Sequence, residues 1–174
     1  MISGTGDSLV KFNKLLLKSI MEIKIQTAKK EHIQDCLDCA KHSELWEAYY
    51  KSDPLVEDNF KKAIIKKQIY IALNKNENCI GFMGIINNGC FSKFSYLSAL
   101  AVIKRYRRKG IGKQLIQKFE EIGFQKADRV FILVSDFNKK AQSFYKELGY
   151  KKVGIIPDLF KNGISEHLLV KYKI

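Results

Sequence analysis

The chain is poor in the features that mark membrane-spanning, repetitive and disordered proteins. None of its apolar runs approaches the ~20 residues that a membrane helix needs. Only two of its 174 residues are proline, and it has no internal repeat and no low-complexity tract. With 46% hydrophobic residues, the chain is long enough for one well-buried domain and short for two. We therefore expect one globular domain.

Cysteine is also scarce, and its spacing excludes the common metal sites. Cys36 and Cys39 have CxxC spacing, but no second such pair and no HxxxH motif completes a zinc set. We predict that the protein holds no metal. We expect its four cysteines to be small buried apolar residues of a cytoplasmic protein, because the cytosol is reducing. The other two cysteines are Cys79 and Cys90, and the histidines are His32, His42 and His167.

Acidic residues are few relative to basic ones. The chain has 18 Asp and Glu against 31 Lys and Arg, so its formal net charge is +13. That charge is compatible with phosphorylated ligands, nucleic acid or acidic surfaces. The basic residues are spread along the whole chain, which favours a solvated surface. No strand interleaves aromatic and basic residues and no recognition helix is visible, so we expect no specific nucleic-acid partner.

The first twenty residues are predicted to form a basic amphipathic helix. Lysines interrupt its apolar face and no small-residue cleavage site follows, which argues against a signal peptide. Such a helix lies on a membrane surface, packs as a dimerising appendage, or forms a partly ordered tail. A homodimer is therefore one open alternative. Met21 precedes the first expected strand, so we assign residues 1–20 to an extension and 21–174 to the folded domain.

Apolar periodicity divides the domain into alternating strands and helices. The apolar run at 130–134 is typical of a strand buried on both faces, as in a parallel β-α-β crossover. The predicted order is β-α-α-β-β-β-α-β-α-β-β, which is an α/β (α+β) fold with one mixed sheet. Strands are expected at 23–27, 69–73, 79–86, 90–103, 130–134, 150–155 and 166–173, and helices at 29–43, 54–67, 110–125 and 138–148, with turns at 87–89 and 161–163.

A short basic glycine loop is the most informative stretch of the chain. Arg107-Arg108-Lys109-Gly110-Ile111-Gly112 lies between an apolar strand and an amphipathic helix. A helix start presents unpaired backbone N–H groups and a partial positive charge, so it favours an anion such as phosphate. A dinucleotide-binding loop would follow the first strand with different glycine spacing. A Walker loop would place Ser or Thr after Gly-Lys, whereas Gln114 follows Lys113 here.

Two motifs in register resemble the GNAT superfamily of N-acetyltransferases. Leu100-Ala101-Val102-x-x-x-Tyr106-Arg107-x-Lys109-Gly110-Ile111-Gly112 is similar to its acyl-CoA-binding motif, and Asn138-x-x-Ala141-x-x-Phe144-Tyr145-x-x-x-Gly149-Tyr150 to the motif that follows. The family's fold would cover about residues 22–172. Lys104 and Arg108 depart from the family pattern, which often has proline and glycine there, but neither removes a backbone N–H from the loop.

The resemblance implies that acetyl-CoA is the cosubstrate. The N–H groups of residues 107–113 would hold its diphosphate, with the glycines allowing close approach. The pantetheine arm would lie along the strand before the loop, where the next strand must splay away. The cofactor-binding residues that the resemblance implies are Leu100, Ala101, Val102, Arg107, Arg108, Lys109, Gly110, Ile111, Gly112, Lys113, Asn138, Ala141 and Phe144.

Tyr145 is the candidate catalytic residue. Helical spacing places it beside Ala141 and Leu148, so its side chain is expected to face inward. Acyl transfer from a thioester releases a thiolate, and a free thiol has a pKa of about 8.5. A phenol with a pKa of about 10 can protonate that thiolate as the tetrahedral intermediate collapses.

The general base is not identified from sequence. Many family members carry a glutamate on the strand before the loop, but Ser95-Tyr96-Leu97-Ser98-Ala99-Leu100 has no carboxylate. A water relay through Ser95 or Ser98 is one alternative. The other candidates are His42, Glu44, Glu47, Glu57, Asp58 and Glu166.

The sequence therefore predicts an acetyl-CoA-dependent N-acetyltransferase. It would transfer the acetyl group to a primary amine of a small molecule, peptide or protein by direct attack in a ternary complex, without a metal. The helices at 29–67, with the aromatic residues Trp46, Tyr49 and Tyr50, and the loop at 157–163 would select the acceptor. The alternatives are a catalytically inactive acyl-CoA-binding regulatory module and a basic nucleic-acid-binding protein. The acceptor, the length of the acyl group and the oligomeric state stay open.

Overall fold

The computed structural model describes residues 23–41 and 43–173. The amphipathic helix predicted at residues 1–20 and the candidate base His42 lie outside this range. The domain boundary at residue 21 therefore stays a prediction.

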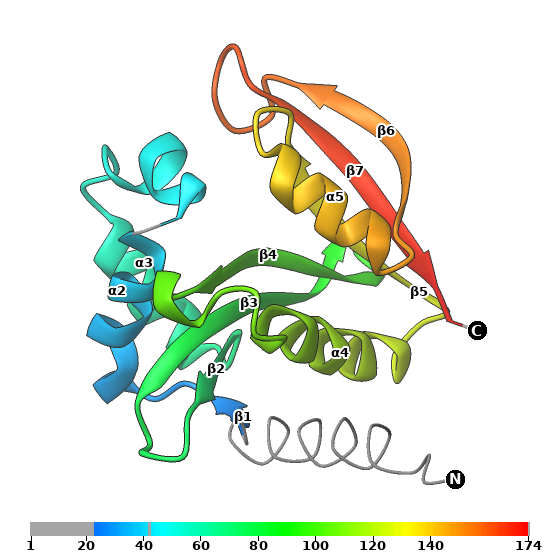
Figure 1. Cartoon of the computed structure of the whole chain (residues 1–174). Coiled ribbons are helices and arrows are strands. Elements are labelled where there is room, and N and C mark those ends of the chain that lie inside the picture. Colours follow the sequence, from blue (N-terminus) through cyan, green and yellow to red (C-terminus); the bar gives the residue numbers. More distant parts are fainter. Residues whose placement is uncertain (1–22, 42, 174) are drawn as a thin grey trace, which may run out of the picture.

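The described residues form a seven-stranded mixed sheet and four α-helices, so the predicted α/β class is confirmed (Figure 1). Short 3₁₀ turns at Lys30–His32 and Lys104–Tyr106 and a π turn at Trp46–Tyr50 connect them. The strands are β1 (Lys24–Thr27), β2 (Ile69–Leu73), β3 (Cys79–Cys90), β4 (Phe94–Val102), β5 (Arg129–Ser135), β6 (Lys151–Pro157) and β7 (Ser165–Tyr172), and the helices are α2 (Ile33–Lys41), α3 (Val56–Ile65), α4 (Ile111–Phe124) and α5 (Lys139–Glu147).

The sheet is divided at the pair β4–β5. The strand order is β1-β2-β3-β4-β5-β7-β6, and only β4 and β5 run parallel to each other. Their register holds two pairs among the described residues, Tyr96 with Phe131 and Leu97 with Ile132. Beyond Leu97 the two strands diverge, as Figure 1 shows. The splay expected between these strands is therefore a property of this sheet.

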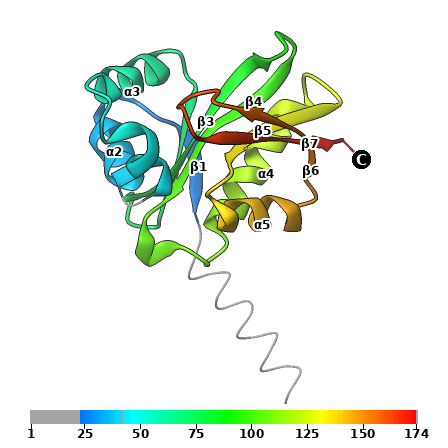
Figure 2. The same cartoon turned by 90° about the horizontal axis from the view of Figure 1, so that it is seen from above.

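Two helices cover each face of the sheet, which gives two hydrophobic cores (Figure 2). On one face, Cys36 of α2 and Phe60 of α3 are buried against β2 and β3. On the other face, α4 buries Ile111, Leu115 and Phe119, and its periodicity also predicts Ile122, which is partly buried there. The helices on the two faces pack against the sheet, so β4 and β5 stay in one sheet although only two residue pairs of the described strands join them.

Helix α5 begins and ends where its sequence predicts. The side chain of Asn138 accepts a hydrogen bond from the backbone N–H of Ala141 at 3.0 Å, as an N-cap does. Gly149 follows the last turn with φ of +87°, the left-handed conformation that favours glycine. These two signals fix the position of Tyr145 on the helix.

The turn predicted at residues 87–89 is wrong, because these residues belong to β3. The strand continues to Cys90 with a shift in register between Ile86 and Cys90. Asn88 takes a φ of +58°, which asparagine tolerates, so the irregularity is absorbed within the strand as a bulge. The hairpin turns instead at Phe91 and Ser92.

The second predicted helix begins later than expected, at Val56 rather than Pro54. The carboxylate of Asp53 accepts a hydrogen bond from the N–H of Leu55 at 2.8 Å, and its carbonyl accepts one from Val56 at 3.2 Å. These bonds form an Asx-type turn that places Pro54 ahead of the helix.

The cysteines behave largely as predicted. Cys36, Cys39 and Cys79 are buried and form no disulfide, but Cys90 is only half-buried at the end of β3. Among the described residues, no group of three or more His, Cys, Asp or Glu side chains is arranged to hold a metal ion. No helix in the described ranges is long and apolar enough to cross a membrane.

Candidate active site

The glycine loop connects β4 to α4 through an unusual backbone. Arg107 is extended, Arg108 has a φ of +59°, and Gly110 caps α4 with a φ of +83°. A side chain at Gly110 would meet no atom within 4 Å, so glycine is favoured there by its conformation and not by crowding. The loop therefore turns sharply enough to aim its amides along the start of the helix.

The backbone N–H groups of residues 108–113 are unpaired in the described structure: none of them donates to a carbonyl. Arg107, the first residue of the predicted set, differs from the others, because its N–H donates to the carbonyl of Lys104 at 3.2 Å. Arg105 and Lys109 both lie over the ring of Tyr106, at 5.3 Å from its centroid. A set of free amides at a helix N-terminus, with cations beside it, is an anion-binding arrangement.

Ile111 and Gly112 do not present a side chain to a ligand. The side chain of Ile111 is buried in the core, so only its N–H is available at the surface. A Cβ built on Gly112 would lie 3.4 Å from Cζ of Phe144. The loop and α5 are therefore in contact at these two motif positions.

A cavity of about 640 Å³ lies at the division between β4 and β5. It is lined by β4 from Tyr96 to Val102, by the end of β5, and by the first turns of α5. Residues of the segment around the π turn line the rest, together with Ile86, Arg107, Phe160 and Glu166. The cavity therefore reaches from the glycine loop to the region predicted to select the acceptor.

The predicted site residues fall into two groups. Those that line the cavity are Leu100, Ala101, Val102, Arg107, Asn138, Ala141 and Tyr145. The others lie at the start of α4 or against it, outside the lining: Arg108, Lys109, Gly110, Ile111, Gly112, Lys113 and Phe144.

Two polar groups expected to face a ligand also make bonds within the protein. Nε of Arg107 donates to the carbonyl of Val102 at 2.8 Å. Asn138 lines the cavity and uses its Oδ1 in capping α5, whereas its amide N–H groups donate to no described residue. Asn138 can therefore donate to a ligand while its oxygen holds the helix.

Tyr145 is buried, yet it lines the cavity. Its hydroxyl bonds to no described residue and is not sealed from the cavity. Burial raises the pKa of Tyr145 above its usual value, and the nearby hydroxyl of Tyr96 adds to the effect. The phenol therefore stays protonated at neutral pH and can donate a proton.

Among the candidate bases, the structure brings Glu166 and Glu44 to the cavity. Glu166 is only 3% exposed, and its Oε1 accepts hydrogen bonds from the hydroxyls of Tyr49 at 2.5 Å and Ser135 at 2.9 Å. Ser98 lines the cavity, whereas Ser95 is buried and bonds to Asn87. The remaining candidates lie elsewhere: Glu57 and Asp58 pair with Lys61 on α3, and Glu47 pairs with Lys51.

Sequence reasoning missed Ser135 and the role of Tyr49. Ser135 ends β5 and stands opposite Glu166 in the register with β7. Tyr49 comes from the π turn, and its ring lies 6.5 Å from that of Phe137 and 6.3 Å from that of Phe160. Ser135 could have been found from the sequence, because it is a polar residue directly at the end of an apolar strand.

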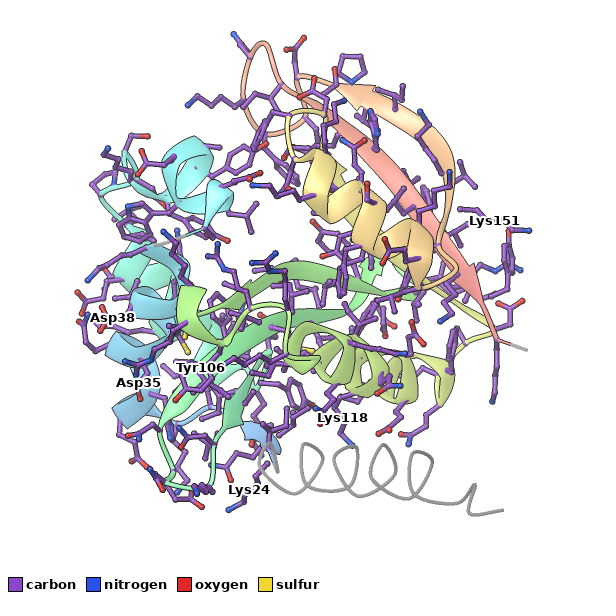
Figure 3. All side chains as sticks on the ribbon, in the orientation of Figure 1. Lys24, Asp35, Asp38, Tyr106, Lys118 and Lys151 are labelled. Atoms are coloured by element: carbon purple, nitrogen blue, oxygen red, sulfur yellow. The ribbon has the colours of Figure 1, made fainter. Side chains whose placement is uncertain are left out.

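Basic residues of the described ranges also lie away from the glycine loop. Lys24, Lys118 and Lys151, labelled in Figure 3, lie on β1, α4 and β6, on separate parts of the molecule. This distribution agrees with the solvated surface expected from the sequence.

Comparison with known sequences gives a consistent family. The sequence profile of the acetyltransferase (GNAT) family matches residues 32–150. The chain is 29% identical over 93 residues to an N-alpha-acetyltransferase of Sulfurisphaera tokodaii, covering 51% of this chain and 54% of that protein. It is 44% identical over 55 residues to a thialysine N-epsilon-acetyltransferase of Mus musculus, covering 31% and 32%. The alignments thus span about half or less of these relatives.

Solved structures share the fold at low identity. Ard1 from Thermoplasma volcanium superposes with a TM-score of 0.73 at 16% identity, covering 87% of this chain and 98% of that one. An aminoglycoside 6'-N-acetyltransferase complexed with coenzyme A gives a TM-score of 0.68 at 17% identity, covering 88% and 98%.

Proposed function

Because the chain belongs to the acetyltransferase (GNAT) family, we propose that it transfers an acetyl group from acetyl-CoA to a primary amine. The reaction proceeds by direct attack in a ternary complex, without a covalent enzyme intermediate. The observation that carries the proposal is the row of unpaired amides at residues 108–113, placed beside a cavity between two diverging strands.

The amides at the start of α4 bind the diphosphate of acetyl-CoA. They are preorganised by the left-handed residues Arg108 and Gly110, so binding requires little reordering of the loop. Arg105 and Lys109, which lie over the ring of Tyr106, add positive charge beside these amides. The exposed position of these cations suits them to phosphate groups that stay partly solvated.

The pantetheine arm enters the cavity along β4. The residues of β4 beyond Leu97 have no partner on β5 in the described sheet, so the arm can lie beside them as an added strand does. Nε of Arg107 donates to the carbonyl of Val102, so the Arg107 side chain forms one wall of the cavity at the end of β4. Asn138 donates from the opposite side.

Tyr145 is the general acid. The neutral amine attacks the thioester carbonyl, and the tetrahedral intermediate collapses with release of the CoA thiolate. The hydroxyl of Tyr145 donates its proton to that sulfur. Its raised pKa keeps the proton on the phenol until the thiolate forms.

Two matched relatives carry N-alpha- and N-epsilon-acetyltransferase in their names, which supports an amino group as the acceptor. The test is to measure acetyl-CoA binding by calorimetry and then CoA release with panels of amines, peptides and proteins. We expect both binding and amine-dependent CoA release. Binding without transfer to any acceptor would instead indicate an acyl-CoA-binding regulatory module, for which the lack of a carboxylate on β4 is the supporting observation.

A further inference from the structure

Glu166 is a buried carboxylate that accepts hydrogen bonds from the described residues through only one of its two oxygens. It is 3% exposed and lines the cavity. Both of its hydrogen bonds, from Tyr49 and Ser135, go to Oε1. Oε2 accepts no hydrogen bond from the described residues and is not sealed from the cavity. One acceptor oxygen of a buried group is therefore presented to whatever occupies the cavity.

No cation of the described chain pairs with Glu166. No Lys, Arg or His nitrogen of the described residues lies within 4.0 Å of its carboxylate. The two basic residues of the cavity lining are directed elsewhere: Arg107 bonds to Val102, and Lys140 lies 3.9 Å from Glu44. A buried charge without a counter-charge is costly, so a cationic ligand would be stabilised at this position.

The two hydroxyls beside Glu166 hold it in place for such a ligand. Burial and the hydrogen bond to Glu166 raise the pKa of Tyr49 to about 12, so its hydroxyl remains a donor. Ser135 lies opposite Glu166 in the β5–β7 register, which fixes the second donor on rigid strands. Two donors aimed at Oε1 fix the carboxylate group in position and thereby orient Oε2.

We propose that Glu166 binds the ammonium group of the acceptor through Oε2 and accepts its proton. This proposal rests on the acetyl-transfer function above. An N–H bond of the ammonium breaks, its electron pair stays on nitrogen, and an O–H bond forms on Glu166. The neutral nitrogen attacks the thioester. The second proton lost by nitrogen replaces the one that Tyr145 gives to the thiolate, so one proton is released per turnover, from Glu166.

The surroundings of Glu166 favour an acceptor with one ammonium group on an alkyl or aryl body. The ring of Tyr49 lies against Phe160, and Tyr50 and Tyr96 also line the cavity. The other carboxylates of the lining differ from it: Asp53 accepts hydrogen bonds with both oxygens, and Glu44 is solvent-exposed, 3.9 Å from the exposed Lys140. A second ammonium would therefore find no open carboxylate comparable to that of Glu166.

The direct test is amine binding to the CoA-loaded protein by calorimetry, with phenethylamine and hexylamine as probes. In Glu166→Gln, the amide oxygen can still accept from Tyr49 and Ser135, so the fold is retained while the charge is lost. We expect amine binding to weaken by about tenfold or more, with the affinity for acetyl-CoA and the melting temperature unchanged. Glu121→Gln is the matched control, because Glu121 is exposed on α4 and pairs only with Lys118 among described residues.

The kinetic test uses an acceptor that the wild type acetylates. Loss of a general base lowers kcat by about 10² to 10⁴-fold, and loss of the ammonium contact raises KM as well. Glu166→Asp, which keeps the charge on a shorter stem, should recover part of the binding. A residue with only a structural role would instead lower the melting temperature and leave the per-molecule kinetics of the folded enzyme unchanged.

The outcomes separate this proposal from the proposed function. Amine binding that depends on Glu166 without any acetyl transfer would support the binding role and remove the acetyl-transfer function together with the proton-transfer step. Acetylation by Glu166→Gln with wild-type kcat and KM would overturn the role of Glu166 and leave the acetyltransferase intact. Absence of amine binding by the wild type would also overturn it.

Discussion

Phe144 lies directly against Gly112. A Cβ built on Gly112 would sit 3.4 Å from Cζ of the Phe144 ring, at the distance of an ordinary contact. This contact joins the start of α4, with its unpaired amides, to α5, which carries Asn138 and Tyr145. The residue at position 112 therefore influences both walls of the cofactor site.

Gly112→Val should weaken acetyl-CoA binding. The methyl groups of valine extend past the 3.4 Å contact into the ring of Phe144, and overpacking of this kind costs about 1–3 kcal/mol. Displacement of the loop by that strain corresponds to a loss of about tenfold or more in affinity. Calorimetry with acetyl-CoA measures it, and Gly154→Val, at a site with no atom within 4 Å, is the control. An unchanged Kd would show that the diphosphate does not bind at this loop.

Tyr145→Phe should lower kcat by about 10²-fold or more with little change in acetyl-CoA affinity, because only the proton donor is lost. The ring keeps its packing against Phe144 and Tyr150. Single-turnover acetyl transfer is the appropriate measurement, since it isolates the chemical step. Tyr172→Phe, an exposed position on β7, is the matched control. An equal rate for Tyr145→Phe and the wild type would remove Tyr145 from the role of acid.

Alkaline pH should destabilise the protein through Tyr49. Its pKa in the folded state is raised to about 12, mainly by burial and by the hydrogen bond to Glu166. Because the folded state holds this proton more tightly, the stabilisation is complete below about pH 10 and is lost as the pH rises to about 12. Burial raises the pKa of Tyr96 and Tyr145 in the same direction.

Urea unfolding between about pH 8 and about pH 12 measures this effect. The free energy of unfolding of the wild type should fall above about pH 10, and that of Tyr49→Phe should fall less steeply. Parallel curves for the two proteins would contradict the assigned burial and hydrogen bonding of Tyr49.

Gly123→Ala should destabilise the fold although it improves helix propensity. Alanine gains about 1 kcal/mol over glycine within a helix. A Cβ at position 123 would, however, lie 2.3 Å from Cγ1 of Val130, which is fully buried on β5. Relief of that clash costs about 1–3 kcal/mol, so we expect net destabilisation and a melting temperature lower by several degrees.

The double variant Gly123→Ala with Val130→Ala provides the check on that cause. Removal of the clashing methyl groups should restore part of the stability that the alanine at 123 removes. Gly154→Ala, on an open face of β6, should stay within about 0.5 kcal/mol of the wild type. A stabilised Gly123→Ala variant would show that α4 does not pack closely on β5.

Elements that depend on local chemistry could be predicted from sequence. Asn138 and Gly149 mark the two ends of α5, and the apolar periodicity of α4 gives its buried face. The turn at residues 87–89 was wrong because an Asn-rich segment can form either a turn or a bulge, and the pairing of β3 with β4 decides between them. Local sequence signals therefore do not predict the end of a strand when pairing with a neighbouring strand sets its length.

The acceptor end of the site could not be predicted in the same way. Glu166 was one of several candidate bases, and only the β5–β7 register brings it to Ser135. Its other partner, Tyr49, comes from 117 positions away in the chain. Such a cluster depends on tertiary packing, whereas the glycine loop is contiguous in sequence and carries its own signature.

The division of the sheet has an evolutionary consequence. Tyr96 with Phe131 and Leu97 with Ile132 are the described strand pairs that connect one half of the sheet to the other, and α4 packs across the junction. All other strand pairs of the described sheet lie within one half or the other, so the β6–β7 hairpin can diverge without disturbing the residues that bind acetyl-CoA. We expect that a chimera carrying the β6–β7 hairpin of a relative would take on the acceptor preference of that relative and keep its own affinity for acetyl-CoA.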